Sequence, residues 1–207
     1  MKPDLLLFDL DGTLADTADD IADSLLSVLD AAGRPPLPRA DIVAAIGNGV
    51  RRLVERTTPP PHEEIVARFM TVYASRCLQR TRLYPGVLET LGRLPGRKVI
   101  LTNKPADLSH TIVRGLAIAG FFERIYGGDS LPARKPDREV VRAILAETGA
   151  RRPVLIGDSG VDVQTARNAG IPVIVVTYGY HKPGDLDAAD ARVDRFEKLA
   201  VCIETFP

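Results

Sequence analysis

The sequence predicts an α/β protein with a doubly wound, mostly parallel sheet and a helical segment inserted after the first strand. Short apolar runs end in polar clusters, helical periodicity follows each of them, and one long interval shows helices but no convincing strand. A chain of 207 residues accommodates one α/β domain with an insert, but hardly two independent domains. Right-handed crossovers between the parallel strands are therefore expected.

The strands are predicted from short runs rich in Leu, Ile or Val. A strand that is buried on both faces of a sheet shows a continuous hydrophobic run rather than an alternating one. The predicted strands are Leu5–Phe8, residues 99–101, residues 154–156 and Val173–Val176.

Apolar residues at helical spacing predict the helices between these strands. They are Ile21, Leu25, Leu26 and Leu29 in the first helix, Leu108, Ile112, Val113 and Leu116 in the second, and Val140, Val141, Ile144 and Leu145 in the third. Gly33 can end the first helix, because glycine readily adopts the left-handed conformation that follows many helices.

The interval from about Asp16 to Leu83 breaks the alternation of strand and helix. Helices are predicted over residues 41–46, 50–56 and 63–79, with breaks at Gly47-Asn48-Gly49 and Pro59-Pro60-Pro61 and a returning turn at Tyr84-Pro85-Gly86. We therefore predict a core domain of residues 1–15 and 84–207 and a helical cap domain of residues 16–83. The cap is expected over the carboxyl ends of the strands, where open α/β sheets bind ligands.

Composition argues against several classes of protein. Lys and Arg number 27 and Asp and Glu number 27, tryptophan is absent, and aromatic residues make up 5%, so neither a polyanion-binding surface nor a base-stacking surface is expected. No apolar run approaches the roughly 20 residues of a membrane span. Cys77 and Cys202 match no metal or redox spacing, which is typical of reduced thiols and predicts a cytoplasmic protein.

The strongest chemical signal is Asp9-Leu10-Asp11-Gly12-Thr13, directly after the first strand. Two carboxylates two residues apart project toward one side of the strand end, and Gly12 allows a sharp turn. Such carboxylates repel unless a cation lies between them or one of them is protonated. Asp-Gly is also a common turn pair, which is the structural alternative.

A second acidic cluster, Gly157-Asp158-Ser159-Gly160-Val161-Asp162, follows another predicted strand. In a parallel sheet this strand end lies at the same edge as Asp9, so Asp9, Asp11 and Asp158 can converge on one hard cation such as Mg²⁺. The structural alternative makes Asp158 a helix cap and Asp162 a favourable charge in the first helical turn.

Two further positions can bind an anion. Thr102 and Asn103 end the second core strand, where a hydroxyl, an amide and backbone N–H groups meet the start of a helix. Lys135, followed by Pro136, supplies a cation before the helix that begins near Asp137. Helix capping and a solvated surface lysine are the alternatives.

These clusters, in this order, resemble the haloacid dehalogenase superfamily of phosphohydrolases over nearly the whole chain. Asp9 and Asp11 match its first motif, Thr102 the second, Lys135 the third, and Asp158, Ser159 and Asp162 the fourth. The insert resembles the helical cap of its subfamily I. Residues 46–50, 127–132 and 177–180 resemble the phosphoglycolate phosphatase group within it.

The resemblance implies a mechanism. Asp9 is expected to attack phosphorus and form an aspartyl-phosphate, and Asp11 to act as general acid and then general base. Mg²⁺ is expected on Asp9, the Asp11 carbonyl and Asp158. The phosphate is expected to contact Gly12, Thr13, Thr102, Asn103 and Lys135. Ser159 and Asp162 are expected to orient this first layer of ligands.

The expected partner is a small phosphorylated metabolite, most simply 2-phosphoglycolate, with no nucleic acid or membrane involved. Its carboxylate needs donors from the cap, for which Gly47, Asn48 and Arg51 or Arg52 are candidates; an interhelix turn and solvated arginines are the alternative. Pyrophosphate, sugar phosphates and nucleoside monophosphates stay open as substrates. A catalytically silent phosphate-binding module, and either a monomer or a homodimer, also stay open.

Overall fold

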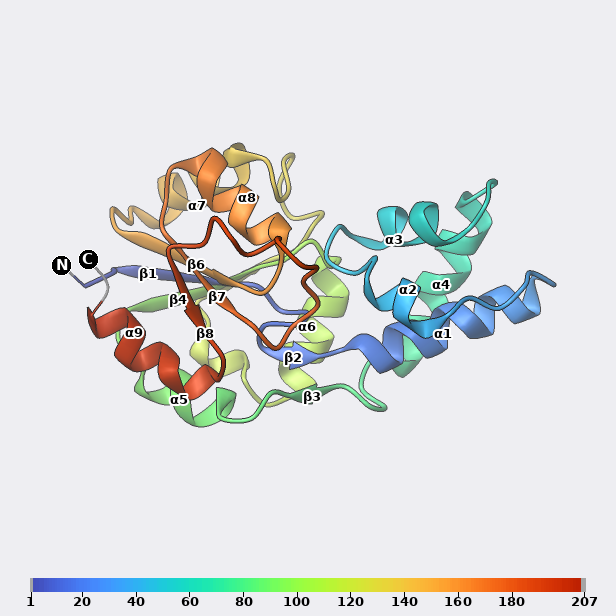
Figure 1. Cartoon of the computed structure of the whole chain (residues 1–207), viewed down its shortest axis with the longest axis horizontal. Helices are drawn as coiled ribbons and strands as arrows, with labels where there is room; N and C mark the ends of the chain where they lie inside the picture. Colours follow the sequence, from blue (N-terminus) through green and yellow to red (C-terminus); the bar gives the residue numbers. More distant parts are fainter. Residues whose placement is uncertain (1, 206–207) are drawn as a thin grey trace.

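The computed structural model describes residues 2–205 and contains a six-stranded parallel sheet (Figure 1). The strand order is β5-β4-β1-β6-β7-β8. The strands are β1 (Leu5–Phe8), β4 (Arg97–Leu101), β5 (Arg124–Tyr126), β6 (Pro153–Gly157), β7 (Val173–Val176) and β8 (Ala191–Val193). The predicted α/β fold with a parallel sheet is confirmed, and β1 lies at its centre between β4 and β6.

Helices cover both faces of the sheet because the central strands are apolar on both sides. Leu5 and Leu7 of β1 pack in one core and Leu6 and Phe8 in the other, as the alternation of side chains along a strand requires. The first core includes residues of α7 (Arg138–Thr148) and α8 (Gly160–Ala169), and the second those of α5 (Val87–Arg93), α6 (Ala106–Gly115) and α9 (Leu199–Thr205). Two short 3-10 helices, Ala119–Phe121 and Phe196–Lys198, complete this layer.

The segment after β1 forms a group of helices to one side of the sheet (Figure 1). These are α1 (Ala18–Ala31), α2 (Arg39–Val43), α3 (Val50–Thr57) and α4 (Glu63–Arg76). Helix α1 packs against α4, with Leu25, Phe69 and Tyr73 among the buried side chains. The position of this group agrees with the expected cap, whereas the division at residues 15–16 and 83–84 stays a prediction.

Two short strands join the helical group to the sheet, and the sequence analysis missed both. Strands β2 (Ala15–Asp16) and β3 (Arg82–Leu83) pair antiparallel. Each has only two residues, which is too few for a hydrophobic pattern to show. The chain therefore leaves the sheet and returns to it through neighbouring strands.

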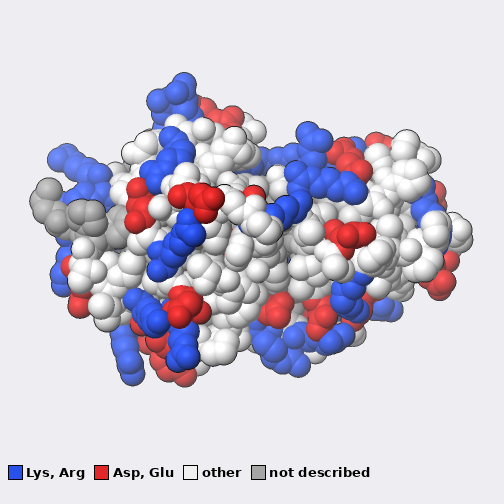
Figure 2. All heavy atoms as spheres, in the orientation of Figure 1, with Lys and Arg blue, Asp and Glu red and all other residues white. Residues whose placement is uncertain are grey.

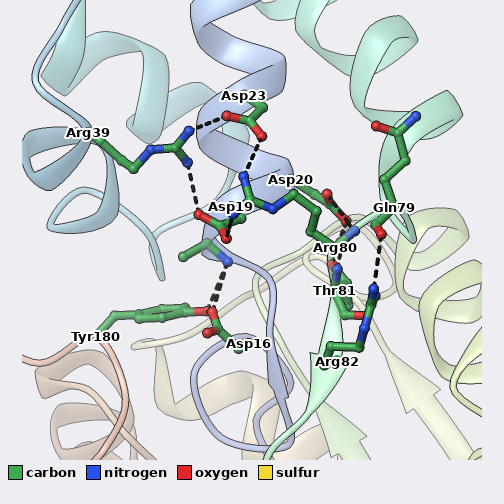
Figure 3. Close-up of polar contacts among 11 residues, drawn as sticks. Asp16, Asp19, Asp20, Asp23, Arg39, Gln79, Arg80, Thr81, Arg82 and Tyr180 are labelled. Carbon is green, nitrogen blue, oxygen red and sulfur yellow. Dashed lines mark hydrogen bonds and ion pairs between the residues drawn. The ribbon is translucent and has the colours of Figure 1, made fainter.

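A network of polar contacts holds this junction (Figure 3). The Asp20 carboxylate, which is 2% exposed, accepts hydrogen bonds from the main-chain N–H groups of Arg80 and Thr81 and from the Thr81 hydroxyl. The Tyr180 hydroxyl accepts from the N–H groups of Thr17 and Ala18 at the start of α1. Side chains far apart in sequence thus fix both ends of the helical segment.

Charges of both signs are interspersed over the face in Figure 2, in keeping with the balanced composition. Within residues 2–205, no helix has the length and apolar character needed to cross a membrane. Cys77 and Cys202 are free thiols.

Candidate active site

The aspartate pair lies directly beyond the carboxyl end of β1, where the chain turns sharply at Gly12. Asp9 and Asp11 are 4% and 9% exposed, and Gly12 has a φ of +87°, a conformation that L side chains rarely adopt. Lys135 Nζ lies 2.9 Å from Asp9 Oδ1. The predicted nucleophile is therefore buried beside the predicted motif lysine.

Asp158 follows β6, the neighbour of β1, and is held beside Asp9. Its Oδ1 accepts a hydrogen bond from the Thr13 hydroxyl at 2.8 Å, and its Oδ2 accepts one from the Tyr180 N–H at 2.7 Å. Glycines enclose this carboxylate: a Cβ added at Gly12 or Gly179 would lie 2.2 or 2.3 Å from Asp158 Oδ2. Each oxygen keeps a lone pair for a further ligand.

Asp162, in the first turn of α8, binds its neighbours with both oxygens. Its Oδ1 lies 2.6 Å from Lys135 Nζ, and its Oδ2 accepts from the hydroxyl of Ser159 at 2.7 Å and from the Ser159 N–H at 3.1 Å. Asp162 therefore positions Lys135 and caps α8. Ser159, rather than Asp158, is the N-cap residue, so the capping alternative for Asp158 is wrong.

The cluster of Asp9, Asp158 and Asp162 has more negative than positive charge. Oxygens of the three buried carboxylates lie within 4.8 Å of one another, and Lys135 is the one cation in contact with them among the described residues. A divalent cation would compensate this charge, and carboxylate oxygens are the ligands that Mg²⁺ prefers. Asp9 and Asp158 therefore fit such an ion, whereas the oxygens of Asp162 already contact Lys135 and Ser159.

The pKa values of the two aspartates show that burial and the neighbouring carboxylates disfavour their charged forms. Burial raises the pKa of Asp9 to about 7; the Lys135 ammonium opposes the shift, and the Asp162 charge adds to it. Burial, together with Asp162 and Asp9, raises the pKa of Asp158 well above its usual value. Burial opposes the charge of Lys135, but the two carboxylates outweigh it and raise the pKa of this lysine.

The predicted phosphate-binding residues differ in their surroundings. Thr102, at the end of β4, accepts the N–H of Lys104 with its hydroxyl oxygen at 3.2 Å and retains its own proton to donate. Asn103 Nδ2 donates to the carbonyls of Gly47 and Lys135, both at 3.0 Å, and thereby joins the helical segment to the lysine loop.

Gly12 and Thr13 have other partners in this structure. The Gly12 N–H donates to the Ala15 carbonyl at 2.9 Å, and the Thr13 hydroxyl donates to Asp158. They shape the turn and orient Asp158 here, so phosphate contacts by these two residues stay a prediction.

The Asp11 carboxylate lies outside the acidic cluster and is held by a lysine that sequence reasoning missed. Lys104 Nζ is 3.0 Å from both Asp11 oxygens, and the Thr17 hydroxyl donates to Asp11 Oδ1 at 2.7 Å. Lys104 is 6% exposed, and its ammonium lies 4.7 Å from the centre of the Tyr73 ring. The only sequence signal was its position directly after Asn103.

A cavity connects the aspartates with the helical segment. Its walls comprise Asp9, Asp11, Thr102, Asn103, Lys104, Pro105 and Leu108 from the sheet side, and Ile21, Ile46, Gly47, Gly49, Val50, Leu53, Phe69 and Tyr73 from the helical side. The helical wall is thus almost entirely apolar.

Three of the predicted cap residues are absent from these walls. Asn48 lines a different hollow, beside Ser159 and Tyr180. The Arg51 side chain is 53% exposed and pairs with Glu55 and Glu63. Arg52, the alternative to Arg51, is 60% exposed and also pairs with Glu55. The structure brings Gly47 to the cavity but leaves both arginines at the surface.

A parallel α/β sheet with paired aspartates beyond its first strand, a facing lysine and a helical segment over the cavity defines a hydrolase of the haloacid dehalogenase type. The chain belongs to the family of haloacid dehalogenase-like hydrolases, whose model matches residues 6–176.

Named relatives place the chain more closely within this family. It is 38% identical over 205 residues to a phosphoglycolate phosphatase of Caulobacter vibrioides, covering 92% of this chain and 86% of the relative. It is 39% identical over 208 residues to a plasmid-encoded phosphoglycolate phosphatase of Cupriavidus necator, covering 94% and 90%. The crystal structure of a predicted phosphoglycolate phosphatase from Haemophilus somnus matches with a TM-score of 0.90 at 28% identity, covering 96% of this chain and 97% of that one.

Proposed function

We propose that this chain is a Mg²⁺-dependent phosphatase that hydrolyses 2-phosphoglycolate to glycolate and phosphate. The observation that carries the proposal is the meeting of Asp9, Asp158 and Lys135 beyond the ends of two adjacent strands. The phosphoglycolate phosphatases among its relatives, at 38% and 39% identity, support the choice of substrate.

Asp9 is the proposed nucleophile. One of its oxygens attacks phosphorus, the bond from phosphorus to the leaving-group oxygen breaks, and the phosphoryl group remains on Asp9 as an aspartyl-phosphate. Asp11 gives a proton to the leaving oxygen and then takes one from the water that attacks the aspartyl-phosphate. Phosphate leaves, and Asp9 is restored.

Asp9, the Asp11 carbonyl and Asp158 would hold Mg²⁺, which supplies positive charge that lets a phosphate dianion approach a carboxylate. Asp162 and Ser159 keep Lys135 and the start of α8 in position. Thr13 and Tyr180 orient Asp158. These contacts prepare the site before the substrate arrives, so little reorganisation is needed during the reaction.

The Thr102 hydroxyl, the Asn103 main chain and the Lys135 ammonium are the proposed ligands of the phosphoryl oxygens. A hydroxyl and an ammonium donate to these oxygens as their charge shifts in the transition state. The cavity is small, because the centres of water molecules can occupy only about 40 Å³ of it. One water molecule needs about 10–15 Å³ of such space. Such a space favours a small ester over a nucleotide.

The test is phosphate release from 2-phosphoglycolate by the purified chain with Mg²⁺ and with EDTA. We expect release with Mg²⁺, its loss with EDTA and its recovery when Mg²⁺ is restored. Asp9→Asn, which retains size but removes the nucleophilic charge, should lower kcat by at least about 10⁴-fold. Circular dichroism of the variant controls for folding. Metal-independent release, or undiminished turnover by Asp9→Asn, would refute the mechanism, and absence of all release would leave a phosphate-binding module.

A further inference from the structure

Lys104 and Tyr73 form an unassigned pair in the wall of the cavity. Among the described residues of that wall, Lys104 is the one cation, and its ammonium contacts the Asp11 carboxylate. Tyr73 belongs to α4 on the helical side and is 1% exposed. Its hydroxyl lies beside the Lys104 ammonium, which can only donate to it, so the hydroxyl proton has no acceptor. A buried hydroxyl whose proton has no acceptor costs about 1–3 kcal/mol. Its presence in the cavity wall therefore points to a polar ligand.

We propose that the Lys104 ammonium and the Tyr73 hydroxyl bind the carboxylate of the leaving group. The inference rests on the proposed function and deepens it: the substrate class is phosphate esters of short hydroxy acids, and these two residues determine that preference.

The position of Asp11 places the leaving group beside Lys104. A general acid must lie within hydrogen-bond reach of the oxygen to which it gives its proton. Lys104 Nζ is 3.0 Å from both oxygens of the Asp11 carboxylate. In glycolate, the carboxylate carbon is only two bonds from the oxygen that Asp11 serves. The carboxylate of such a leaving group therefore lies within reach of the ammonium.

Lys104 has the capacity for a second anion. An ammonium has three N–H donors, and Asp11 is its one carboxylate partner among the described residues. On the helical side the ammonium faces the Tyr73 ring. In the substrate-free protein the Asp11 charge outweighs burial and raises the pKa of Lys104, so this lysine is an ammonium before the substrate binds.

Within residues 2–205, the rest of the cavity wall offers the carboxylate no other cation. The helical wall otherwise consists of apolar side chains and two glycines, and burying an unpaired carboxylate against such a surface is costly. Arg51 and Arg52, the cations expected from the sequence, are exposed and paired with glutamates. Lys104, rather than either arginine, is therefore the proposed cation for the substrate carboxylate.

The first experiment compares 2-phosphoglycolate with ethyl phosphate, which lacks the carboxylate. The readout is the ratio of their kcat/KM values, because Lys104 also contacts Asp11 and its loss can slow both substrates. We expect Tyr73→Phe to lower this ratio about tenfold and Lys104→Met about 100-fold. Tyr126→Phe is the matched control, since that hydroxyl bonds Glu147 away from the cavity, and its ratio should equal that of the wild type. Equal losses on both substrates would overturn the proposal.

The second experiment measures binding alone and avoids leaving a buried Asp11 charge unpaired. In the Asp11→Asn background, calorimetry compares 3-phosphonopropanoate, a non-hydrolysable analogue of the substrate, with propylphosphonate, which has no carboxylate. We expect the carboxylate to strengthen binding at least tenfold, and Lys104→Met in this background to abolish the difference. An unchanged difference overturns the proposal. If the wild type hydrolyses neither ester, the proposed function fails, and this binding comparison alone decides for or against the carboxylate site.

Discussion

Replacing Asp20 by alanine tests whether the junction of the helical segment depends on one buried carboxylate. Three donors lose their acceptor: the N–H groups of Arg80 and Thr81 and the Thr81 hydroxyl, at 2.9–3.0 Å. Hydrogen bonds to a charged group contribute about 1.5–3 kcal/mol each, and the two Thr81 donors are buried. The Arg80 N–H is closer to solvent, so its hydrogen bond contributes less to the free energy of unfolding. We expect the free energy of unfolding to fall by about 3–5 kcal/mol.

Urea unfolding followed by circular dichroism measures this loss, with the slope m compared between variants. Asp23→Ala is the matched control on the same helix, because Asp23 forms ion pairs with Arg39 and Arg80 at the surface (Figure 3). Exposed pairs contribute about 0–1 kcal/mol, so this variant should differ little from the wild type. A loss below about 1.5 kcal/mol for Asp20→Ala, with unchanged m, would refute the argument.

Further predictions concern the acidic cluster. Gly179→Ala places a Cβ 2.3 Å from Asp158 Oδ2, so the carboxylate must move and kcat should fall at least about 100-fold. Gly120→Ala is the control, because no atom lies within 4 Å of the added Cβ, and its kcat should equal that of the wild type. Equal activity of the two variants would contradict this prediction. The raised pKa of Asp9, about 7, means that a bound proton competes with the metal below that pH. Mg²⁺ affinity by calorimetry should therefore be at least about tenfold weaker at pH 6 than at pH 8, because the pKa of Asp158 is raised as well, and a pH-independent affinity would remove both aspartates from the ligands. The same pKa, raised above that of the unfolded chain, makes the contribution of Asp9 to metal-free stability decline between about pH 4 and pH 7, which thermal melts in EDTA across this range would detect.

The sequence predicted the centre of the sheet better than its edges. Strands β1 and β7 have the predicted bounds, and β4 and β6 contain the predicted runs, since a strand buried on both faces must be apolar throughout. Strands β5 and β8 have three residues each and include Arg124 and Arg192. A short edge strand needs no such run, so these two could not be predicted from hydrophobicity.

The candidate site divides in a similar way. Asp9, Asp158 and Lys135 could be predicted to meet, because each follows a strand or precedes a helix at one edge of a parallel sheet. Lys104 and Tyr73 could not, because their proximity depends on how α4 packs over the loop after β4. Hydrophobic periodicity predicts single helices and strands, but it does not predict which residues of the helical segment contact the sheet.

The pairing of β2 with β3 brings the two ends of the helical segment together. An insertion whose two ends meet imposes almost no length requirement on the chain between them, because closing a longer loop adds little entropy. We therefore expect the sheet to tolerate helical segments of other lengths between Asp16 and Arg82. The junction therefore separates the length of the helical segment from the arrangement of the strand ends.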